Sequence, residues 1–263
     1  MEETFSGLQR GVAEFIGTAL LVFIGAGSVP AILLLEGGSK APFSGADLGF
    51  IALAFGLIVT CMIYTVGKVS GCHINPAVTF ALAVTRKMPW KDVPLYWGSQ
   101  FLGATAGAFA MLGVFGHRAI ALGYGFGVTT FDHHVTSWGG AMLAEGLGTA
   151  ILMFVVLGIV DGRSPAGWAG LVIGLVVVAV IITLGPVTNA SINPARSFGT
   201  LFVSATSDGG VHNWTKFLGA YVPAQLFGAT FATVLYDWMA KPMQVVRPIR
   251  EGIDRIPAEE LAV

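Results

Sequence analysis

Charged residues are scarce in this chain of 263 residues. Asp, Glu, Lys and Arg together make up 11% of it, whereas a soluble domain usually carries about 25%. A chain with so few charges would lack the charged surface of a soluble domain. The formal net charge is −1, so the composition gives no basic surface for a nucleic-acid partner.

Cysteine is scarce as well, and the side chains that bind metals are scattered. Cys61 and Cys72 lie in or beside apolar segments, so a disulfide is not expected and the redox compartment is not indicated. The pair His133 and His134 has no Cys or other ligand at zinc-site spacing, so no metal site is expected. The apolar segments hold no convergent nucleophile, base or metal ligands. We therefore expect neither an enzyme nor a bound cofactor.

Apolar residues are abundant and come in long runs. They make up 54% of the chain, and the mean hydropathy is +0.76. Crossing a bilayer takes roughly 20 apolar residues. The runs predict six membrane-spanning helices, near residues 11–35, 48–67, 94–116, 138–160, 167–185 and 214–240.

The tetrapeptide Ile-Asn-Pro-Ala occurs twice between these runs, at residues 74–77 and 192–195. Asn is costly in hydrocarbon without partners, but Asn-Pro suits a helix start, with Asn as the N-cap and Pro at the first helical position. The apolar pieces that follow, 76–84 and 194–203, hold about ten residues each and span ~15 Å, half of a ~30 Å hydrocarbon core. We therefore expect two re-entrant half-helices that begin near the middle of the membrane. Unwound backbone at that depth is tolerated where it is buried in protein or lines a watery cavity, so the motif indicates a pore.

The two halves of the chain repeat one another. Residues 13–19 match 144–150, and residues 100–105 match 225–230. Each half has three full spans, an odd number, so the second half is inserted upside down. The predicted fold is an all-α membrane protein with six transmembrane helices, two half-helices and an inverted repeat. The channel domain covers 11–240, with repeats at about 11–116 and 138–240, between an N-terminal segment 1–10 and a tail 241–263.

Lys and Arg predict the orientation, because cytoplasmic loops carry an excess of both. With both termini in the cytoplasm, Lys40, Arg118 and Lys216 lie outside and Arg196 lies in the membrane. The remaining ten of the 14 basic residues lie inside: Arg10, Lys68, Arg86, Lys87, Lys91, Arg163, Lys241, Arg247, Arg250 and Arg255. The sequence therefore predicts a multi-pass protein of the cell membrane with both termini cytoplasmic.

From about Arg10 to Tyr236 the chain resembles the major intrinsic proteins, the aquaporin and aquaglyceroporin family. The resemblance is carried by residues 13–18, by Ser-Gly-Cys-His-Ile-Asn-Pro-Ala-Val-Thr at 70–79, and by Asn-Pro-Ala-Arg-Ser at 193–197. Two such motifs on half-spans of a six-span inverted repeat are far more specific than one. The resemblance implies a homotetramer in the lipid bilayer, with a pore in every protomer for water and small neutral solutes.

The motif residues suggest how such a pore works: Asn75, Pro76 and Ala77 in the first half, and Asn193, Pro194 and Ala195 in the second. As N-caps, the two asparagines would accept with their carbonyl oxygens and leave their NH₂ groups facing the pore. A passing water would accept from both amides. The half-helix N-termini bring roughly +0.5 charge each, which opposes protons and cations.

An outer constriction is expected around Arg196, which follows the second motif directly. An Arg at this depth costs ~2.5–3.5 kcal/mol on insertion scales, so it should face water or carbonyls. The resemblance adds Phe55, Ile181 and Ala190 to this constriction. Water channels of the family carry His where this chain has Ile181. Glycerol channels tend to carry Trp, Gly and an aromatic at these three positions, and Asp where this chain has Ser197. The set is intermediate and looks like that of archaeal-type and some unclassified prokaryotic aquaporins. Ordinary helix packing of Ile181 and Ala190 is the alternative.

Glu14 and Glu145 are the carboxylates deep in full spans. A proton relay is one interpretation of such residues. Their duplication favours a structural one, and the resemblance implies that they hold the backbone of the re-entrant loops. His73, two residues before Asn75, is a candidate for lining the inner vestibule.

Three functions remain open from the sequence. The first is a passive channel for water and some small neutral solutes. The second is a facilitator mainly for glycerol, for which the constriction lacks the typical residues. The third is a proton-coupled transporter, which would need a chain of ionisable groups through the core. Only the two glutamates are available for such a chain.

Overall fold

The computed structural model describes residues 5–37, 43–121, 123–207 and 210–241. Within them, six helical segments are long and apolar enough to cross a membrane, as the sequence predicts. They are Gly7–Leu35, Gly45–Ser70, Trp90–Phe115, Trp138–Val160, Ala169–Thr188 and Trp214–Ala240. Most of the predicted tail, residues 242–263, lies outside the described residues, as does Lys40.

The first and last spans are composite. The first consists of α1 (Gly7–Leu20), a π-helical stretch (Leu21–Ala26) and α2 (Ser28–Leu35). The last consists of α10 (Trp214–Lys216), a π-helical stretch (Phe217–Tyr221) and α11 (Val222–Ala240). The other full spans are α3 (Gly45–Ser70), α5 (Val93–Phe115) after a 3₁₀ turn at Trp90–Asp92, α7 (Trp138–Val160) and α8 (Ala169–Thr188). The connection between α5 and α7 holds a short helix, α6 (His117–Ala121), and a 3₁₀ turn at Gly123–Phe126.

Two short helices follow the Asn-Pro pairs. Helix α4 runs over Pro76–Val84 and α9 over Pro194–Ala205. The first has the predicted bounds, and the second is two residues longer than expected. Both are too short to cross a bilayer at 1.5 Å per residue.

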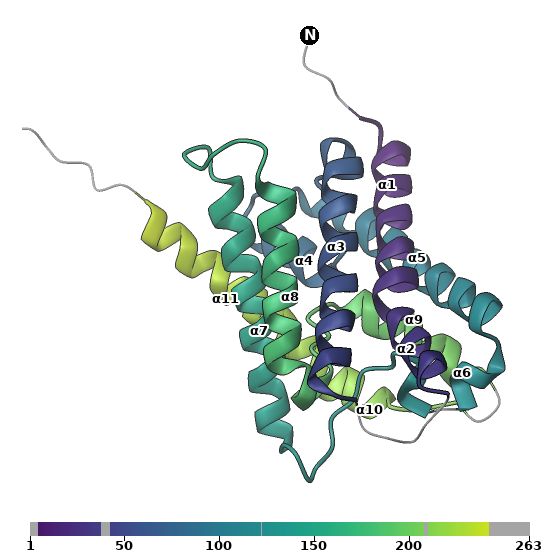
Figure 1. The fold of residues 1–263 in the computed structure, drawn as a ribbon. Helices are drawn as coiled ribbons and strands as arrows, with labels where there is room; N and C mark the ends of the chain where they lie inside the picture. The colour runs from purple at the N-terminus through teal and green to yellow at the C-terminus, as the bar shows by residue number, and fades with distance from the viewer. Residues whose placement is uncertain (1–4, 38–42, 122, 208–209, 242–263) are drawn as a thin grey trace, which may run out of the picture.

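Equivalent helices of the two halves pack in equivalent ways (Figure 1). Helix α1 packs on α5, α7 packs on α11, and α3 crosses α8 between the halves. The α3–α8 crossing is close at Gly56 and Gly174, because a Cβ on Gly174 would lie 2.5 Å from the Gly56 carbonyl oxygen. The start of α1 and the α7–α8 connection lie at one end of the molecule, and α6 and α10 lie at the other.

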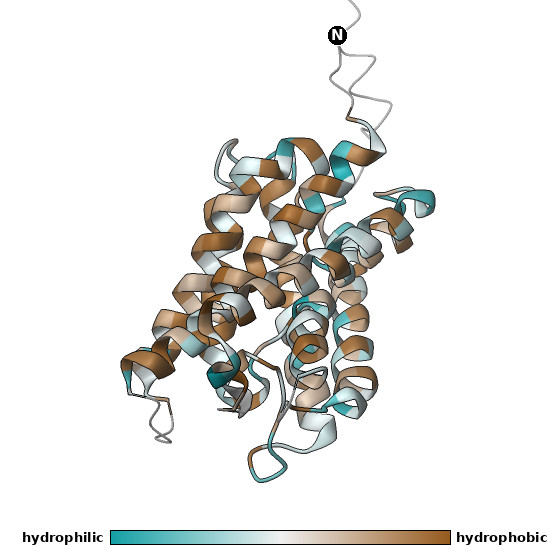
Figure 2. Ribbon diagram, turned by 90° about the vertical axis from the view of Figure 1, so that its right-hand side faces the viewer, coloured by the Kyte–Doolittle hydropathy of each residue, from teal (hydrophilic) through white to brown (hydrophobic). Residues whose placement is uncertain are grey.

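The outer faces of the spans are apolar (Figure 2), with hydrophilic residues concentrated at helix ends and in connections. Large side chains are exposed on several spans, including Leu57, Leu102, Leu143, Leu175 and Phe227. Such a surface suits lipid rather than water. A separate group of polar residues, which includes Glu14, Glu145, Asn75 and Asn193, is buried between the helices.

Candidate functional site

Asn75 and Asn193 cap the two half-helices where these meet inside the molecule. Both have an extended backbone, with φ of −156° and −152°. Asn75 Oδ1 accepts from the Ala77 backbone N–H at 2.9 Å, and Asn193 Oδ1 accepts from those of Ala195 and Arg196 at 3.0 and 3.2 Å. Proline follows each asparagine at the first helical position, as a helix start favours.

The asparagine NH₂ groups do more than face a cavity. Asn75 Nδ2 donates to the Ile192 carbonyl at 2.8 Å, and Asn193 Nδ2 donates to the Ile74 carbonyl at 2.8 Å. Because a primary amide has two N–H donors, each asparagine keeps one donor beyond this crossed pair. One N–H of each NH₂ group therefore joins the two re-entrant loops, and the other is left for the cavity that both asparagines line.

Glu14 of α1 holds the first re-entrant loop in place through hydrogen bonds. Its two carboxylate oxygens accept four hydrogen bonds of 2.7–2.9 Å, from Ser70 Oγ, the backbone N–H groups of His73 and Ile74, and Gln100 Nε2. Glu145 of α7 holds the second loop in the same way. Its carboxylate oxygens accept four hydrogen bonds of 2.6–3.0 Å, from Thr188 Oγ1, the backbone N–H groups of Ser191 and Ile192, and Gln225 Nε2. Both carboxylates have no exposed surface.

The loops that these carboxylates hold have strained backbones at matching positions. Ile74 and Ile192 have φ of 42° and 45°, and Cys72 and Ala190 have φ of 49° and 41°. A β-branched residue at positive φ is a genuine outlier. It persists where its surroundings over-determine it, as the four bonds to each carboxylate do here. This geometry turns the Ile74 and Ile192 carbonyls toward the opposite asparagine.

A cavity of about 240 Å³ runs along the two re-entrant loops. Asn75, Asn193 and His73 line it, together with apolar side chains such as Val156 and Val177. A second cavity of about 450 Å³ lies beyond it on the α2–α3 side. The two cavities share Phe55, Ile181 and Arg196, and Ala190 lines the first. Three of the four residues expected at a constriction thus stand where one cavity passes into the other.

Arg196 lies at this passage with 4% of its surface exposed. Its Nη1 donates to the Gly127 carbonyl at 2.6 Å, and its Cζ lies 5.1 Å from the centre of the Phe55 ring. Its Nε has no hydrogen-bond partner among the described residues. A guanidinium has five N–H donors, of which the bond to Gly127 uses one, so Arg196 has donors left for a molecule in the passage.

His73 and Cys72 directly precede Ile74 and Asn75 in the first re-entrant loop. His73 Nδ1 is 3.1 Å from Thr79 Oγ1, and its ring lies 4.9 Å from that of Tyr96. Cys72 is buried and lines the first cavity, whereas Cys61 on α3 is exposed.

The sequence analysis missed the polar residues that complete the two carboxylate sites. Gln100 and Gln225 each donate to a glutamate, while Tyr96 Oη and Tyr221 Oη donate to the Ser70 and Thr188 carbonyls at 2.7 and 2.8 Å. In both halves Tyr precedes Gln by four residues. The glutamines open the matched segments 100–105 and 225–230, and extending the comparison of the repeats four residues upstream reaches the tyrosines.

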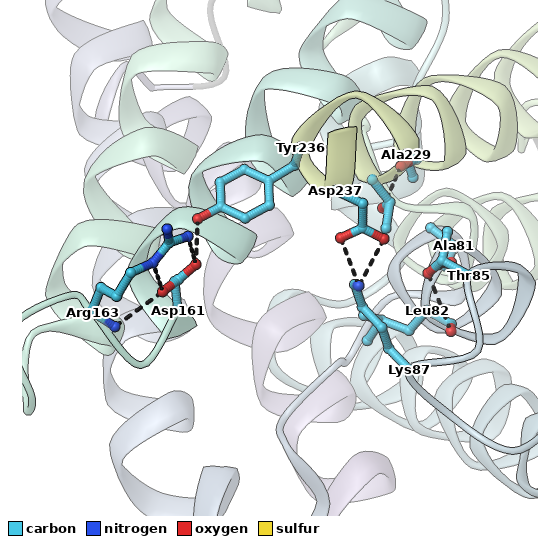
Figure 3. Close-up of polar contacts among 10 residues, drawn as sticks. Ala81, Leu82, Thr85, Lys87, Asp161, Arg163, Ala229, Tyr236 and Asp237 are labelled. Atoms are coloured by element: carbon cyan, nitrogen blue, oxygen red, sulfur yellow. Dashed lines mark hydrogen bonds and ion pairs between the residues drawn. The ribbon is translucent and has the colours of Figure 1, made fainter. Parts of the chain in front are cut away.

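Ion pairs fasten the end of the molecule that carries the α7–α8 connection (Figure 3). Lys87, after α4, pairs with Asp237 of α11 at 2.7 Å. Arg163 pairs with Asp161, which also accepts from Tyr236 Oη at 3.0 Å. Hydrogen bonds from the Arg163 guanidinium hold the pKa of the Asp161 carboxyl below its usual range. This carboxyl is therefore charged at neutral pH, and the α7–α8 connection stays joined to α11.

Taken together, the site is a passage with apolar walls and few polar groups. Two amide donors lie at the half-helix starts, and the free guanidinium donors lie at the passage between the cavities. The arrangement suits single small polar molecules that exchange hydrogen bonds with fixed donors. Among the described residues, no three His, Cys, Asp or Glu side chains are grouped to hold a metal ion.

Known proteins are similar to this chain in both sequence and architecture. The sequence model described as "Major intrinsic protein" matches residues 1–236. Aquaporin AqpM of Methanothermobacter marburgensis is 40% identical over 242 residues, covering 88% of this chain and 97% of that protein. Aquaporin Z of Rhodopseudomonas palustris is 36% identical over 248 residues, covering 92% and 98%. The X-ray structure of the aquaglyceroporin from Plasmodium falciparum superposes with a TM-score of 0.74 at 27% identity, covering 94% of this chain and 99% of that one. On these grounds the chain belongs to the major intrinsic protein family.

Proposed function

We propose that this protein is a passive transmembrane channel that conducts water and small neutral solutes and excludes protons and ions. The observation that carries the proposal is the convergence of Asn75 and Asn193 on one cavity, each with an amide donor left over after the crossed bonds. A water molecule there accepts from both amides with its lone pairs. Its hydrogens then point away along the file of waters.

Proton exclusion follows from the same geometry. A water oriented by two donors does not accept a hydrogen from its neighbour, so a chain of waters through this point does not pass a proton along. The N-termini of α4 and α9 add partial positive charge at the same place, and Arg196 adds a full charge at the outer passage. The two helix N-termini and the Arg196 charge all raise the energy of a cation in the passage and leave a neutral molecule unaffected.

The constriction of Phe55, Ile181, Ala190 and Arg196 decides which solutes pass besides water. Ile181 supplies an apolar wall where water channels of the family carry His, which favours passage of small neutral solutes as well. Ser197 stands where glycerol channels carry Asp, and this argues against a dedicated glycerol facilitator. The similar proteins include both aquaporins and an aquaglyceroporin.

Proton-coupled transport is the weaker alternative. Glu14 and Glu145 each accept four hydrogen bonds and have no exposed surface. A relay group must gain and lose a proton in contact with a file of waters. These carboxylates are buried, and their oxygens instead accept hydrogen bonds that hold the loops. Their contacts therefore support the structural role.

The location and assembly are part of the proposal. Arg10, Lys87 and Arg163 lie at the end that carries the α7–α8 connection, whereas Lys216 contacts residues of the outer connection. This grouping supports cytoplasmic termini in a cell membrane. The family resemblance supports a homotetramer.

Osmotic shock of proteoliposomes tests the proposal. Vesicles that contain the full chain should shrink faster than empty vesicles in a hyperosmotic solution, while a pH gradient across them decays no faster. A matched Asn193→Asp variant places a carboxylate where the amide donor was, and water passage should fall. Equal shrinkage of empty and loaded vesicles, with the protein shown to be folded, would refute the water channel.

A further inference from the structure

The outer segment, residues 127–131, is fastened to the second re-entrant loop and to the start of the last span. Besides the bond from Arg196 to Gly127, the Thr130 N–H donates to Asn189 Oδ1 at 2.9 Å. Lys216 Nζ donates to the Phe131 carbonyl at 2.6 Å. The outer segment therefore holds the acceptor for Arg196 and is itself held at several points.

A line of three buried hydroxyls provides a further attachment. Thr129 Oγ1 lies 2.6 Å from Ser197 Oγ, which lies 2.5 Å from Ser191 Oγ. Ser191 Oγ in turn donates to the Asn193 carbonyl at 3.1 Å. All four residues are buried, with 1–6% of their surface exposed.

Donor counting gives this line one direction. A hydroxyl has one hydrogen, and a carbonyl oxygen can only accept, so the hydrogen of Ser191 goes to Asn193. Ser197 must then donate to Ser191, and Thr129 must donate to Ser197. Thr129 is thus the first donor of a line that ends at one of the two asparagines in the cavity.

We propose that Thr129 is a positioning residue for the selectivity of the channel and that it acts through Ser197 on Arg196. Thr129 lies two residues after Gly127, whose carbonyl holds the guanidinium, and Ser197 directly follows Arg196. The Thr129–Ser197 bond therefore fixes the donor and the acceptor of the Arg196–Gly127 bond relative to each other. Without it, the Gly127 carbonyl is freer to move and the guanidinium is less firmly held in the passage beside Phe55 and Ile181.

The role rests on the proposed function, and it concerns solute discrimination rather than conduction itself. Water is small enough to pass whether or not the guanidinium is held in one place. A larger neutral solute such as glycerol fills the passage, so its rate depends on the clearance that Arg196 leaves. The ratio of glycerol to water permeability is therefore the quantity that Thr129 controls.

Thr129→Val tests the proposal, because valine keeps the shape of threonine and lacks its donor. In proteoliposomes of the full chain, the glycerol-to-water ratio should rise by about threefold or more, the effect expected from losing one neutral hydrogen bond. Thr129→Ser keeps the donor and should have the wild-type ratio, whereas Ser197→Ala should raise the ratio as Thr129→Val does. The double variant should go no further than either single one, since both remove the same bond.

Thr233→Val is the matched control. Thr233 is also fully buried, and its hydroxyl donates to the Ala229 carbonyl within α11, away from the constriction. It should leave the ratio at the wild-type value. An unchanged ratio in both Thr129→Val and Ser197→Ala, or an equal rise in Thr233→Val, would overturn the role of Thr129.

Amide hydrogen exchange separates this role from the channel proposal. Residues 127–131 should exchange faster in Thr129→Val than in the wild type, whatever solute the protein conducts. A wild type that conducts neither water nor glycerol would overturn the proposed function. Unchanged exchange in the outer segment would overturn the positioning role independently.

Discussion

Cys72 and Ala190 occupy matching places in the two re-entrant loops, both at positive φ and both lining the first cavity. A thiol at this place gives chemical access to the passage. Cys61, in contrast, lies on the exposed side of α3 and does not line the cavity. The two cysteines therefore form a natural pair of test and control.

A mercurial should block water passage through the wild-type protein by attaching to Cys72, because the bound metal fills part of the narrow cavity. A reducing thiol should reverse the block. Cys72→Ser should remain open in the stopped-flow assay, and Cys61→Ser should still be blocked. A block that persists in Cys72→Ser would show that the mercurial acts elsewhere.

Ile181 belongs to both cavities and has 4% of its surface exposed. Ile181→His adds a polar wall beside Arg196 and narrows the passage, so glycerol influx should fall several-fold while water passage is largely kept. Ile181→Leu, which conserves volume and polarity, should keep the wild-type ratio. If the histidine variant has unchanged selectivity, Ile181 only packs α8.

At the scale of elements, the half-helices owe their positions to groups outside them. Each begins at an Asn-Pro pair, which local chemistry explains. Each is placed at the centre of the molecule by a buried glutamate, a glutamine and the crossed asparagine bonds. The α3–α8 crossing brings the two halves together through glycines.

Gly174→Ala should destabilise the protein by about 1–3 kcal/mol, the usual cost of overpacking a tight contact. The new Cβ would lie 1.9 Å from Thr60 Oγ1 and 2.5 Å from the Gly56 carbonyl oxygen, so α3 and α8 must separate. The midpoint of thermal unfolding in detergent measures the loss.

Gly113→Ala is the control for this prediction. Gly113 also lies in a helix, α5, and a Cβ there would meet no atom within 4 Å. Alanine favours a helix over glycine by about 1 kcal/mol, so the midpoint should stay or rise. Equal midpoints for both variants would show that the α3–α8 contact adapts without cost.

At the scale of the whole molecule, one chain encloses its own passage. Both cavities are lined by residues of the two halves of a single chain, so conduction does not need a second copy. The apolar outer faces of the spans are then left for lipid, or for the neighbouring protomers of the proposed tetramer.

The purified protein should be a tetramer, with a protein mass four times the 27.4 kDa of one chain by light scattering after subtraction of detergent. Conduction per chain should not depend on assembly, because each passage is complete within its protomer. A mass of 27.4 kDa under conditions where vesicles made from the same sample conduct water would contradict the tetramer.

The sequence by itself determined the six spans, the two half-helices and the repeat, because apolar length, Asn-Pro chemistry and matched segments are local or periodic signals. Only the tertiary structure decided which partners each polar group has. One amide hydrogen of each asparagine is used to join the loops, and four bonds fix each glutamate. Thr129 meets Ser197 although 68 positions separate them in the chain. Such pairings depend on where distant backbone segments come to lie, and residue types alone do not carry that information.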